Sequence, residues 1–238
     1  MSKKVIFISD FFIDEIRGGA EFCNDALINS LKHKFTFERH KSETITLQFI
    51  NDNRDCFFIV ANFFLLREDC KTALRNATYV IFEHDHKYIK TRDPSRYKNY
   101  LAPPQDIVNR EIFTNAKNIF AQSKIQAECV QKNLRVNNVV NLGMSLWTDE
   151  QLQIIENNIK NKKQPDASVV ASRNPTKNTD AAIRYCNDKL IPYTLIGSED
   201  YTEFIKQLSE HEFHVFIPRV LESFNRVLIE ARMLNCKV

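Results

Sequence analysis

Two glutamates near the carboxyl end of the chain, Glu222 and Glu230, lie eight residues apart within 211–238. A short apolar run over 213–217, stopped by a proline, predicts a buried strand. Helical spacing of apolar residues over 224–234 then places the first glutamate in a loop and the second on a helix. Because ligands bind outside the carboxyl ends of strands in an open α/β sheet, this stretch predicts a ligand site.

A basic pair precedes this stretch. Arg173 and Lys177 stand four residues apart, after a strand predicted over 167–171 and before a helix predicted over 179–188. At such a turn an arginine fork, a lysine point charge and the helix N–H groups can hold a diphosphate. Taken in isolation, the two residues favour the alternative of a pair of solvated surface charges.

The first half of the chain offers two further candidates. Gly18 and Gly19 are adjacent in a chain with only 4 glycines, between a strand predicted over 4–9 and a helix predicted over 20–31. This order begins a βαβ unit, and glycine lets a ligand approach the backbone closely, although a plain turn is the alternative. His84 follows another predicted strand, where it could donate or accept a proton near neutral pH; the alternative is a polar loop.

Composition narrows the class of protein. The 238 residues are 43% hydrophobic and 26% charged, which is typical of a globular chain with a core. A formal net charge of +3 gives no argument for nucleic acid, and the apolar runs are too short or too interrupted to span a bilayer. The 6 cysteines are scattered, without CxxC or histidine at ligand spacing, so we expect reduced thiols in a cytoplasmic protein.

The elements that must position these residues alternate between strand and helix. Strands are predicted over 4–9, 44–49, 56–61, 78–82, 118–121, 138–142, 167–171, 192–196 and 213–217. Helices are predicted over 20–31, 67–75, 125–132, 179–188, 201–208 and 224–234. Such alternation is typical of mainly parallel sheets covered on both faces. We therefore expect an α/β fold with domains at 1–146 and 166–238, joined by a linker helix within 147–165.

In this order the motifs resemble those of the GT-B glycosyltransferases of family 4. The matches are GGAE at 18–21, His84-Asp85, Ala121-Gln122-Ser123 with Gln126, Asn141-Leu142-Gly143, the pair Arg173 and Lys177, and Glu-x7-Glu within ESFNRVLIEA. The resemblance covers nearly the whole chain, and Glu-x7-Glu is its most specific part. It implies two Rossmann-like domains facing a cleft, and retaining transfer of a sugar from a nucleotide-diphosphate sugar to an acceptor hydroxyl.

The resemblance also implies a role for each matched residue. Glu222 and His84 would act on the donor sugar, and the glycine loop would approach the diphosphate and the acceptor. The implied donor-binding residues are Gly18, Gly19, Arg173, Lys177, Ser223, Phe224, Asn225 and Glu230, the last through the ribose hydroxyls. The basic pair would neutralise charge on the leaving diphosphate, so we expect no cofactor and no metal, and no DxD motif is present.

The chain also departs from the family pattern. Ser223, Asn225 and Asn235 stand where the family has glycines, and asparagine tolerates the left-handed turns that glycine serves. Only one predicted strand separates the basic pair from the strand at 213–217. The chain ends at 236–238, inside an apparent strand, so we expect a second domain shortened at its carboxyl end. Either the gene product is truncated or a partner chain covers the open edge.

Several alternatives stay open at this point. One is an inactive or partner-dependent remnant that binds nucleotide without turnover, and another is a related enzyme such as a sugar-nucleotide epimerase. A glycosidase would need its two carboxyls about 5–5.5 Å apart, which a loop position and a position two helical turns inward do not favour. The basic loop at 87–98 could meet an anionic acceptor or a membrane surface, or could simply be solvated. The acceptor could be a sugar, a lipid or a protein.

Overall fold

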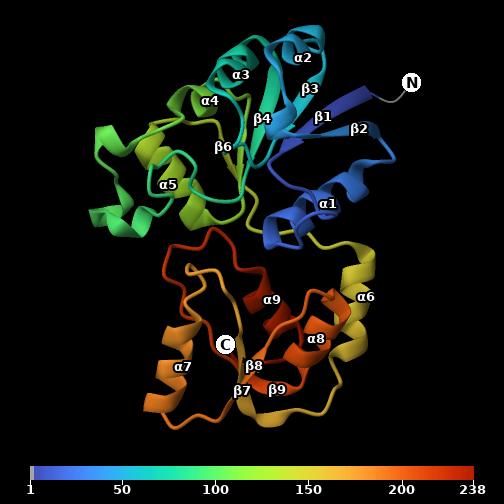
Figure 1. Ribbon diagram of the computed structural model, residues 1–238, viewed down its shortest axis with the longest axis vertical. Coiled ribbons are helices and arrows are strands. Elements are labelled where there is room, and N and C mark those ends of the chain that lie inside the picture. Colours follow the sequence, from blue (N-terminus) through green and yellow to red (C-terminus); the bar gives the residue numbers. More distant parts are fainter. Residues whose placement is uncertain (1–2) are drawn as a thin grey trace. The chain divides into compact units, whose positions relative to one another are not determined.

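The computed structural model describes residues 3–238, and the chain divides into two compact units, residues 1–146 (unit 1) and 147–238 (unit 2) (Figure 1). Each unit is built on a parallel sheet with helical crossovers, which is Rossmann-like topology. The α/β class predicted from the alternation of strands and helices is therefore confirmed.

Unit 1 holds a parallel sheet in the order β2-β1-β3-β4-β5-β6. The strands are β1 Lys3–Ser9, β2 Phe35–Lys41, β3 Phe57–Val60, β4 Thr78–Glu83, β5 Ile119–Ala121 and β6 Val139–Asn141. The helices are α1 Gly19–Leu31, α2 Leu47–Asp52, α3 Glu68–Ala73, α4 Arg110–Thr114 and α5 Lys124–Leu134. Short 3-10 turns are η1 Ser42–Thr44, η2 Leu74–Asn76, η3 Pro94–Arg96, η4 Lys98–Tyr100 and η5 Pro104–Asp106.

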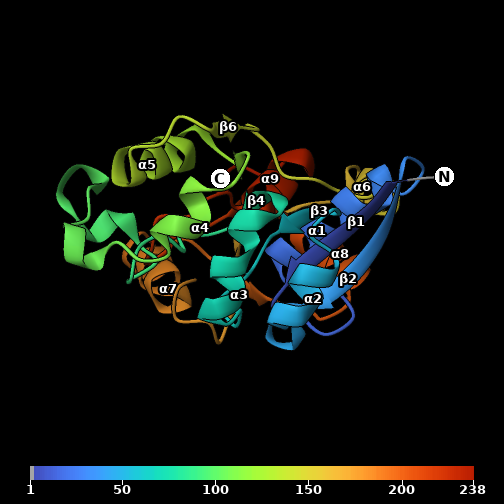
Figure 2. The same cartoon turned by 90° about the horizontal axis from the view of Figure 1, so that it is seen from above.

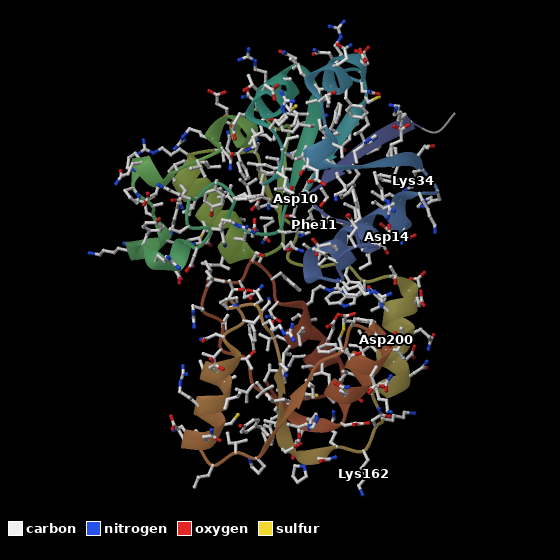
Figure 3. The ribbon with its side chains drawn as sticks, viewed as in Figure 1. Asp10, Phe11, Asp14, Lys34, Lys162 and Asp200 are labelled. Atoms are coloured by element: carbon white, nitrogen blue, oxygen red, sulfur yellow. The ribbon has the colours of Figure 1, made fainter. Side chains whose placement is uncertain are left out.

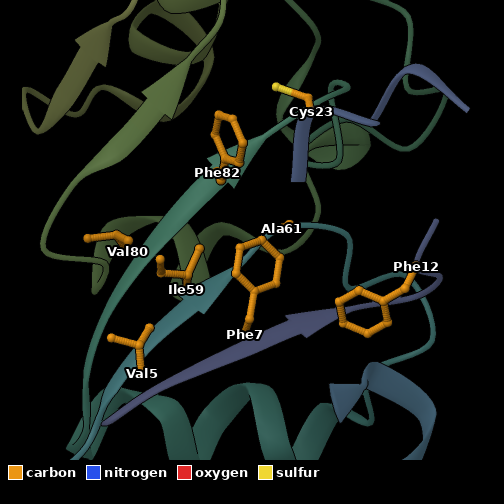
Figure 4. Packing of buried hydrophobic residues seen from close by; sticks show 8 residues of the cluster. All are labelled: Val5, Phe7, Phe12, Cys23, Ile59, Ala61, Val80 and Phe82. Atoms are coloured by element: carbon orange, nitrogen blue, oxygen red, sulfur yellow. The ribbon is translucent and has the colours of Figure 1, made fainter. Parts of the chain in front are cut away.

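Strand β1 lies between β2 and β3, and its apolar run at 5–8 is buried on both faces. Helix α1 packs on the face that Val5 and Phe7 share, and Figure 4 shows this cluster with Phe12, Cys23, Ile59, Ala61, Val80 and Phe82. Helices α2 to α5 each contact the next along the chain, and Figure 2 shows α2, α3 and α4 in a row. Burial on both faces explains the continuous apolar run of β1.

Unit 2 has a smaller parallel sheet in the order β8-β7-β9. Its strands are β7 Gln164–Val170, β8 Tyr193–Ile196 and β9 His211–His214. Its helices are α6 Asp149–Asn158, α7 Thr179–Asp188, α8 Tyr201–Ser209 and α9 Arg226–Met233. Helix α6, expected as a linker, begins at a capping box formed by Thr148 and Gln151 and buries Ile155 in a cluster with residues of α8 and α9. Phe213 pairs with Lys237 in an isolated parallel bridge beside β9.

One strand prediction is wrong, and another has shifted bounds. Residues 44–49 do not form a strand, because the hydroxyl of Thr46 accepts from the backbone N–H of Phe49 and caps helix α2. The strand beside β1 is instead β2, whose consecutive polar and charged side chains over 38–41 are tolerated at the edge of the sheet. The strand predicted over 213–217 also begins earlier, at His211, and ends at His214.

Candidate functional site

The carboxyl edge of the unit 2 sheet brings together two of the predicted site residues. Lys177 lies in the loop after β7 and Glu222 in the loop after β9, and these strands are parallel neighbours. The ammonium of Lys177 donates to Oε1 of Glu222 at 3.0 Å. The two side chains are 39% and 20% exposed, so the ion pair is open to solvent. Parallel pairing of β7 with β9 is what places residues so distant in sequence side by side.

Further bonds fasten the two loops to each other. The backbone N–H of Arg219 donates to the carbonyl of Thr176 at 2.9 Å, and the Asn178 amide donates to the carbonyl of Ile217 at 3.1 Å. The guanidinium of Arg219 donates to Oδ1 of Asn178 at 3.3 Å. Sequence reasoning missed Arg219, although its place between the strand and Glu222 was a usable signal. Arg173 is exposed in the same loop as Lys177.

Asn225 and its neighbours complete this edge. A small hollow of about 100 Å³ is lined by residues that include Ser172, Lys177 and Asn225. The Asn225 side chain accepts from the N–H of Leu228 at 2.9 Å and caps α9, with φ −94°, so its backbone is not left-handed. Asn235 does adopt the left-handed conformation, with φ 62°. Asparagine therefore serves as a helix cap at one family glycine position and as a left-handed residue at another.

Glu230 lies in a different environment from Glu222. It is buried on α9, and its Oε1 accepts from the Trp147 indole at 2.8 Å and from the Tyr201 hydroxyl at 2.9 Å. The guanidinium of Arg226 lies 3.5 Å from the same oxygen and 4.4 Å from the centre of the Trp147 ring. Burial, with the negative charge of Glu230, raises the pKa of the Tyr201 hydroxyl, which stays a donor. All three of these contacts are made to Oε1 of Glu230.

Two of the remaining predicted residues of unit 2 lie just before α9. The ring of Phe224 packs edge-on against Trp147, with the ring centres 6.5 Å apart. Ser223 lies in the loop between Glu222 and Phe224, and it is half-buried. The loop from Glu222 to Asn225 is therefore anchored at both ends, by the ion pair to Lys177 and by the cap of α9.

In unit 1, His84 follows β4 and is buried in a polar network. Its Nε2 lies 2.7 Å from Oδ1 of Asn24 on α1, and its Nδ1 lies 3.4 Å from Oε1 of Gln122 after β5. Gln126 supports this arrangement, because its side chain accepts from the N–H of Gln122 at 2.7 Å and donates to the carbonyl of Glu83 at 3.2 Å. The residues that follow β4 and β5, His84 and Gln122, are thus joined by hydrogen bonds.

The glycine pair opens helix α1. Gly18 is the N-cap and Gly19 the first helical residue. A Cβ on Gly18 would lie 2.4 Å from Oε2 of Glu21, so this position has no room for a side chain while Glu21 keeps its place. Burial raises the pKa of Glu21, whose other oxygen lies 3.5 Å from the Asn62 amide. A side chain at Gly18 would therefore require the Glu21 carboxylate to move.

Sequence reasoning missed a buried charge cluster on either side of His84. Lys87 donates to Glu83 at 3.4 Å and to Asp85 at 2.6 Å, and the Lys87 and Glu83 side chains are almost fully buried. Burial lowers the pKa of Lys87 and raises that of Glu83. Asp10, labelled in Figure 3, follows β1, and its carboxylate accepts from the N–H groups of residues 64 and 65 at 2.9 and 3.0 Å.

Within residues 3–238, no group of three or more His, Cys, Asp or Glu side chains could hold a metal ion. No helix that the structure describes is long and apolar enough to cross a membrane.

Comparisons with known proteins were made for the whole chain. No protein-family model matches it, and no curated protein matches it. Among solved structures, a co-structure of S. aureus MnaA with UDP is 12% identical, with a TM-score of 0.48 over 89% of this chain and 73% of that one. Anabaena HepE in complex with UDP and glucose is 12% identical, with a TM-score of 0.49 over 98% of this chain and 79% of that one.

Proposed function

We propose that this chain transfers a sugar from a nucleotide-diphosphate sugar to an acceptor hydroxyl, with retention of configuration and without a metal. The observation that supports this best is the ion pair of Lys177 and Glu222 at the carboxyl edge of a parallel sheet. A cation for phosphate and a carboxylate for sugar hydroxyls stand there side by side, where α/β sheets bind ligands.

When a donor binds, its diphosphate can replace Glu222 as the partner of Lys177. An exposed pair of this kind contributes about 0–1 kcal/mol, so a diphosphate of higher charge can displace Glu222 from Lys177. Glu222 would then accept hydrogen bonds from hydroxyls of the donor sugar. Lys177 and Arg173 would stabilise the charge that grows on the leaving diphosphate.

The remaining assignments in the proposal follow the resemblance. Ser223, Phe224 and Asn225 would contact the donor sugar, and Glu230 would contact the ribose. His84 would contact the sugar near its reacting carbon. The loop of Gly18 and Gly19 would approach the diphosphate and the acceptor, and no cofactor takes part.

A second candidate function is nucleotide binding without turnover. The bonds from Trp147, Tyr201 and Arg226 to Glu230 favour it, because they leave this carboxylate less available to a donor than the proposal needs. An inactive remnant would keep such internal bonds and would still bind a diphosphate at Lys177.

The experiment measures hydrolysis and transfer with a panel of nucleotide-diphosphate sugars. We compare the natural protein with Lys177→Ala, Glu222→Ala and the control Lys189→Ala, whose side chain is exposed near the end of α7. Turnover with at least one donor, reduced roughly 100-fold or more in the first two variants only, supports the proposal. No turnover with any donor, and no thermal shift with nucleoside diphosphates, overturns it. A thermal shift without turnover supports the second candidate instead.

A further inference from the structure

Arg219 holds both sides of Lys177 in the neighbouring loop. Its backbone N–H bonds to the residue before Lys177, the carbonyl of Thr176, at 2.9 Å. Its guanidinium bonds to the residue after Lys177, Oδ1 of Asn178, at 3.3 Å. Asn178 in turn donates to Ile217, two residues before Arg219, at 3.1 Å. Arg219 therefore runs alongside Lys177 at the carboxyl edge of the sheet.

Lys177 and Arg219 differ in the charge of the group that each side chain contacts. The ammonium of Lys177 is paired with the carboxylate of Glu222 at 3.0 Å. Arg219 is exposed, and the bond from its guanidinium to Asn178 goes to a neutral amide. Arg173 is exposed in the same loop as Lys177. The edge therefore carries three cations, Arg173, Lys177 and Arg219, and one anion, Glu222. An approaching polyanion therefore meets the charge of Arg219 without first breaking an ion pair there.

We infer that Arg219 is a further contact for the donor diphosphate and sets a preference for two linked phosphates over one. This inference rests on the proposed function. A guanidinium fork can bond two oxygens of one phosphate, while the ammonium of Lys177, from the neighbouring loop, bonds the next. A single phosphate can be held by either cation alone, so loss of Arg219 affects it less.

The test uses inorganic pyrophosphate and inorganic phosphate as probes, because neither depends on the unidentified base or sugar. Binding of each is measured by calorimetry to the natural chain and to Arg219→Ala, Arg219→Lys, Lys177→Ala and the control Arg184→Ala, an exposed arginine of α7. Arg219→Ala keeps the backbone bond to Thr176, and melting temperatures establish that all variants fold alike.

We expect Arg219→Ala to weaken pyrophosphate binding about tenfold and phosphate binding by less than about threefold, since a charge-assisted fork is lost. Arg219→Lys should fall between, and Arg184→Ala should match the natural protein. The salt dependence of pyrophosphate binding should also become shallower in Arg219→Ala, which a merely structural role would not produce.

Two outcomes separate this inference from the proposed function. If Lys177→Ala weakens pyrophosphate binding but Arg219→Ala does not, or if Arg219→Ala weakens both probes equally, the inference is wrong and the proposed function stands. If the natural protein binds neither pyrophosphate nor any nucleoside diphosphate, the proposed function falls and the inference falls with it.

Discussion

The indole N–H of Trp147 donates to Oε1 of Glu230 across 2.8 Å. Trp147 is the first residue of unit 2 and the only tryptophan of the chain, and Glu230 lies on α9. The bond therefore anchors the start of unit 2 to the helix that carries the family-like signature. The carboxylate that the resemblance assigns to a ribose is thus also a structural anchor.

Replacement of Glu230 by alanine should destabilise unit 2. Arg226 would lose its buried ion pair with Glu230, and Trp147 and Tyr201 would lose their hydrogen bonds to that carboxylate. We expect the free energy of unfolding to fall by about 3–5 kcal/mol, the usual loss when one member of a buried ion pair is removed. Urea unfolding followed by Trp147 fluorescence measures it, with the exposed Glu156→Ala as control. Equal stability of the two variants would contradict the anchoring role.

The ion pair of Lys177 and Glu222 should matter for binding and hardly at all for stability. Because both side chains are partly exposed, a double-mutant cycle of Lys177→Ala and Glu222→Ala should give a coupling in unfolding free energy below about 1 kcal/mol. For nucleoside diphosphates, Lys177→Ala should weaken binding, whereas Glu222→Ala should leave it equal or tighter, since Lys177 is then released. Weaker diphosphate binding in Glu222→Ala would contradict the proposal that the diphosphate replaces Glu222 at Lys177.

Removing one member of the buried pair of Lys87 and Glu83 should, in contrast, strongly lower the free energy of unfolding. Lys87→Met leaves the Glu83 carboxylate buried beside a methyl group, so we expect a loss of about 3–5 kcal/mol in unfolding free energy. The double variant Lys87→Met with Glu83→Leu should recover much of the loss, because no buried charge remains. Denaturation followed by circular dichroism tests this, with the exposed Lys90→Met as control. A double variant no more stable than Lys87→Met would refute the explanation.

His214 should make unit 2 less stable in mild acid. Burial lowers its pKa to about 4, whereas an unfolded histidine titrates near about 6.5. The unfolded chain therefore takes up the proton first. The stabilisation is complete above about pH 6.5 and is lost as the pH falls to about 4, a change of up to about 3 kcal/mol.

The variant His214→Leu should remove this part of the pH dependence. The hydroxyl of Ser168 keeps its 3.2 Å bond to the carbonyl of Phe213, so the variant leaves that group bonded. Urea unfolding at about pH 7.5 and about pH 5, followed by Trp147 fluorescence, compares the two proteins. The same loss of stability between these pH values in both would assign the pH dependence to other groups.

Local patterns in the sequence were enough for many of the elements. Helix α7 has the predicted bounds, and the strands with unbroken apolar runs, such as β1 and β4, were found because both their faces are buried. The edge strand β2 was missed because its charged residues give no such run, and the run at 44–49 was misread because the cap at Thr46 outweighs its strand propensity. An apolar run by itself indicates a buried strand. The edge position of β2 depends on its place in the sheet, and the cap at Thr46 depends on the residues that follow it.

The residue types at the candidate site were also determined by the sequence alone: a basic pair, two glutamates eight apart and an adjacent pair of glycines. Only the tertiary structure decided their partners. The parallel pairing of β7 with β9 joins Lys177 to Glu222 and brings the loop of Arg219 beside that of Lys177. The packing of α6, α8 and α9 places Glu230 where Trp147 and Tyr201 donate hydrogen bonds to it. Spacing along the chain specifies which groups are available, but contacts across elements decide which group each one meets.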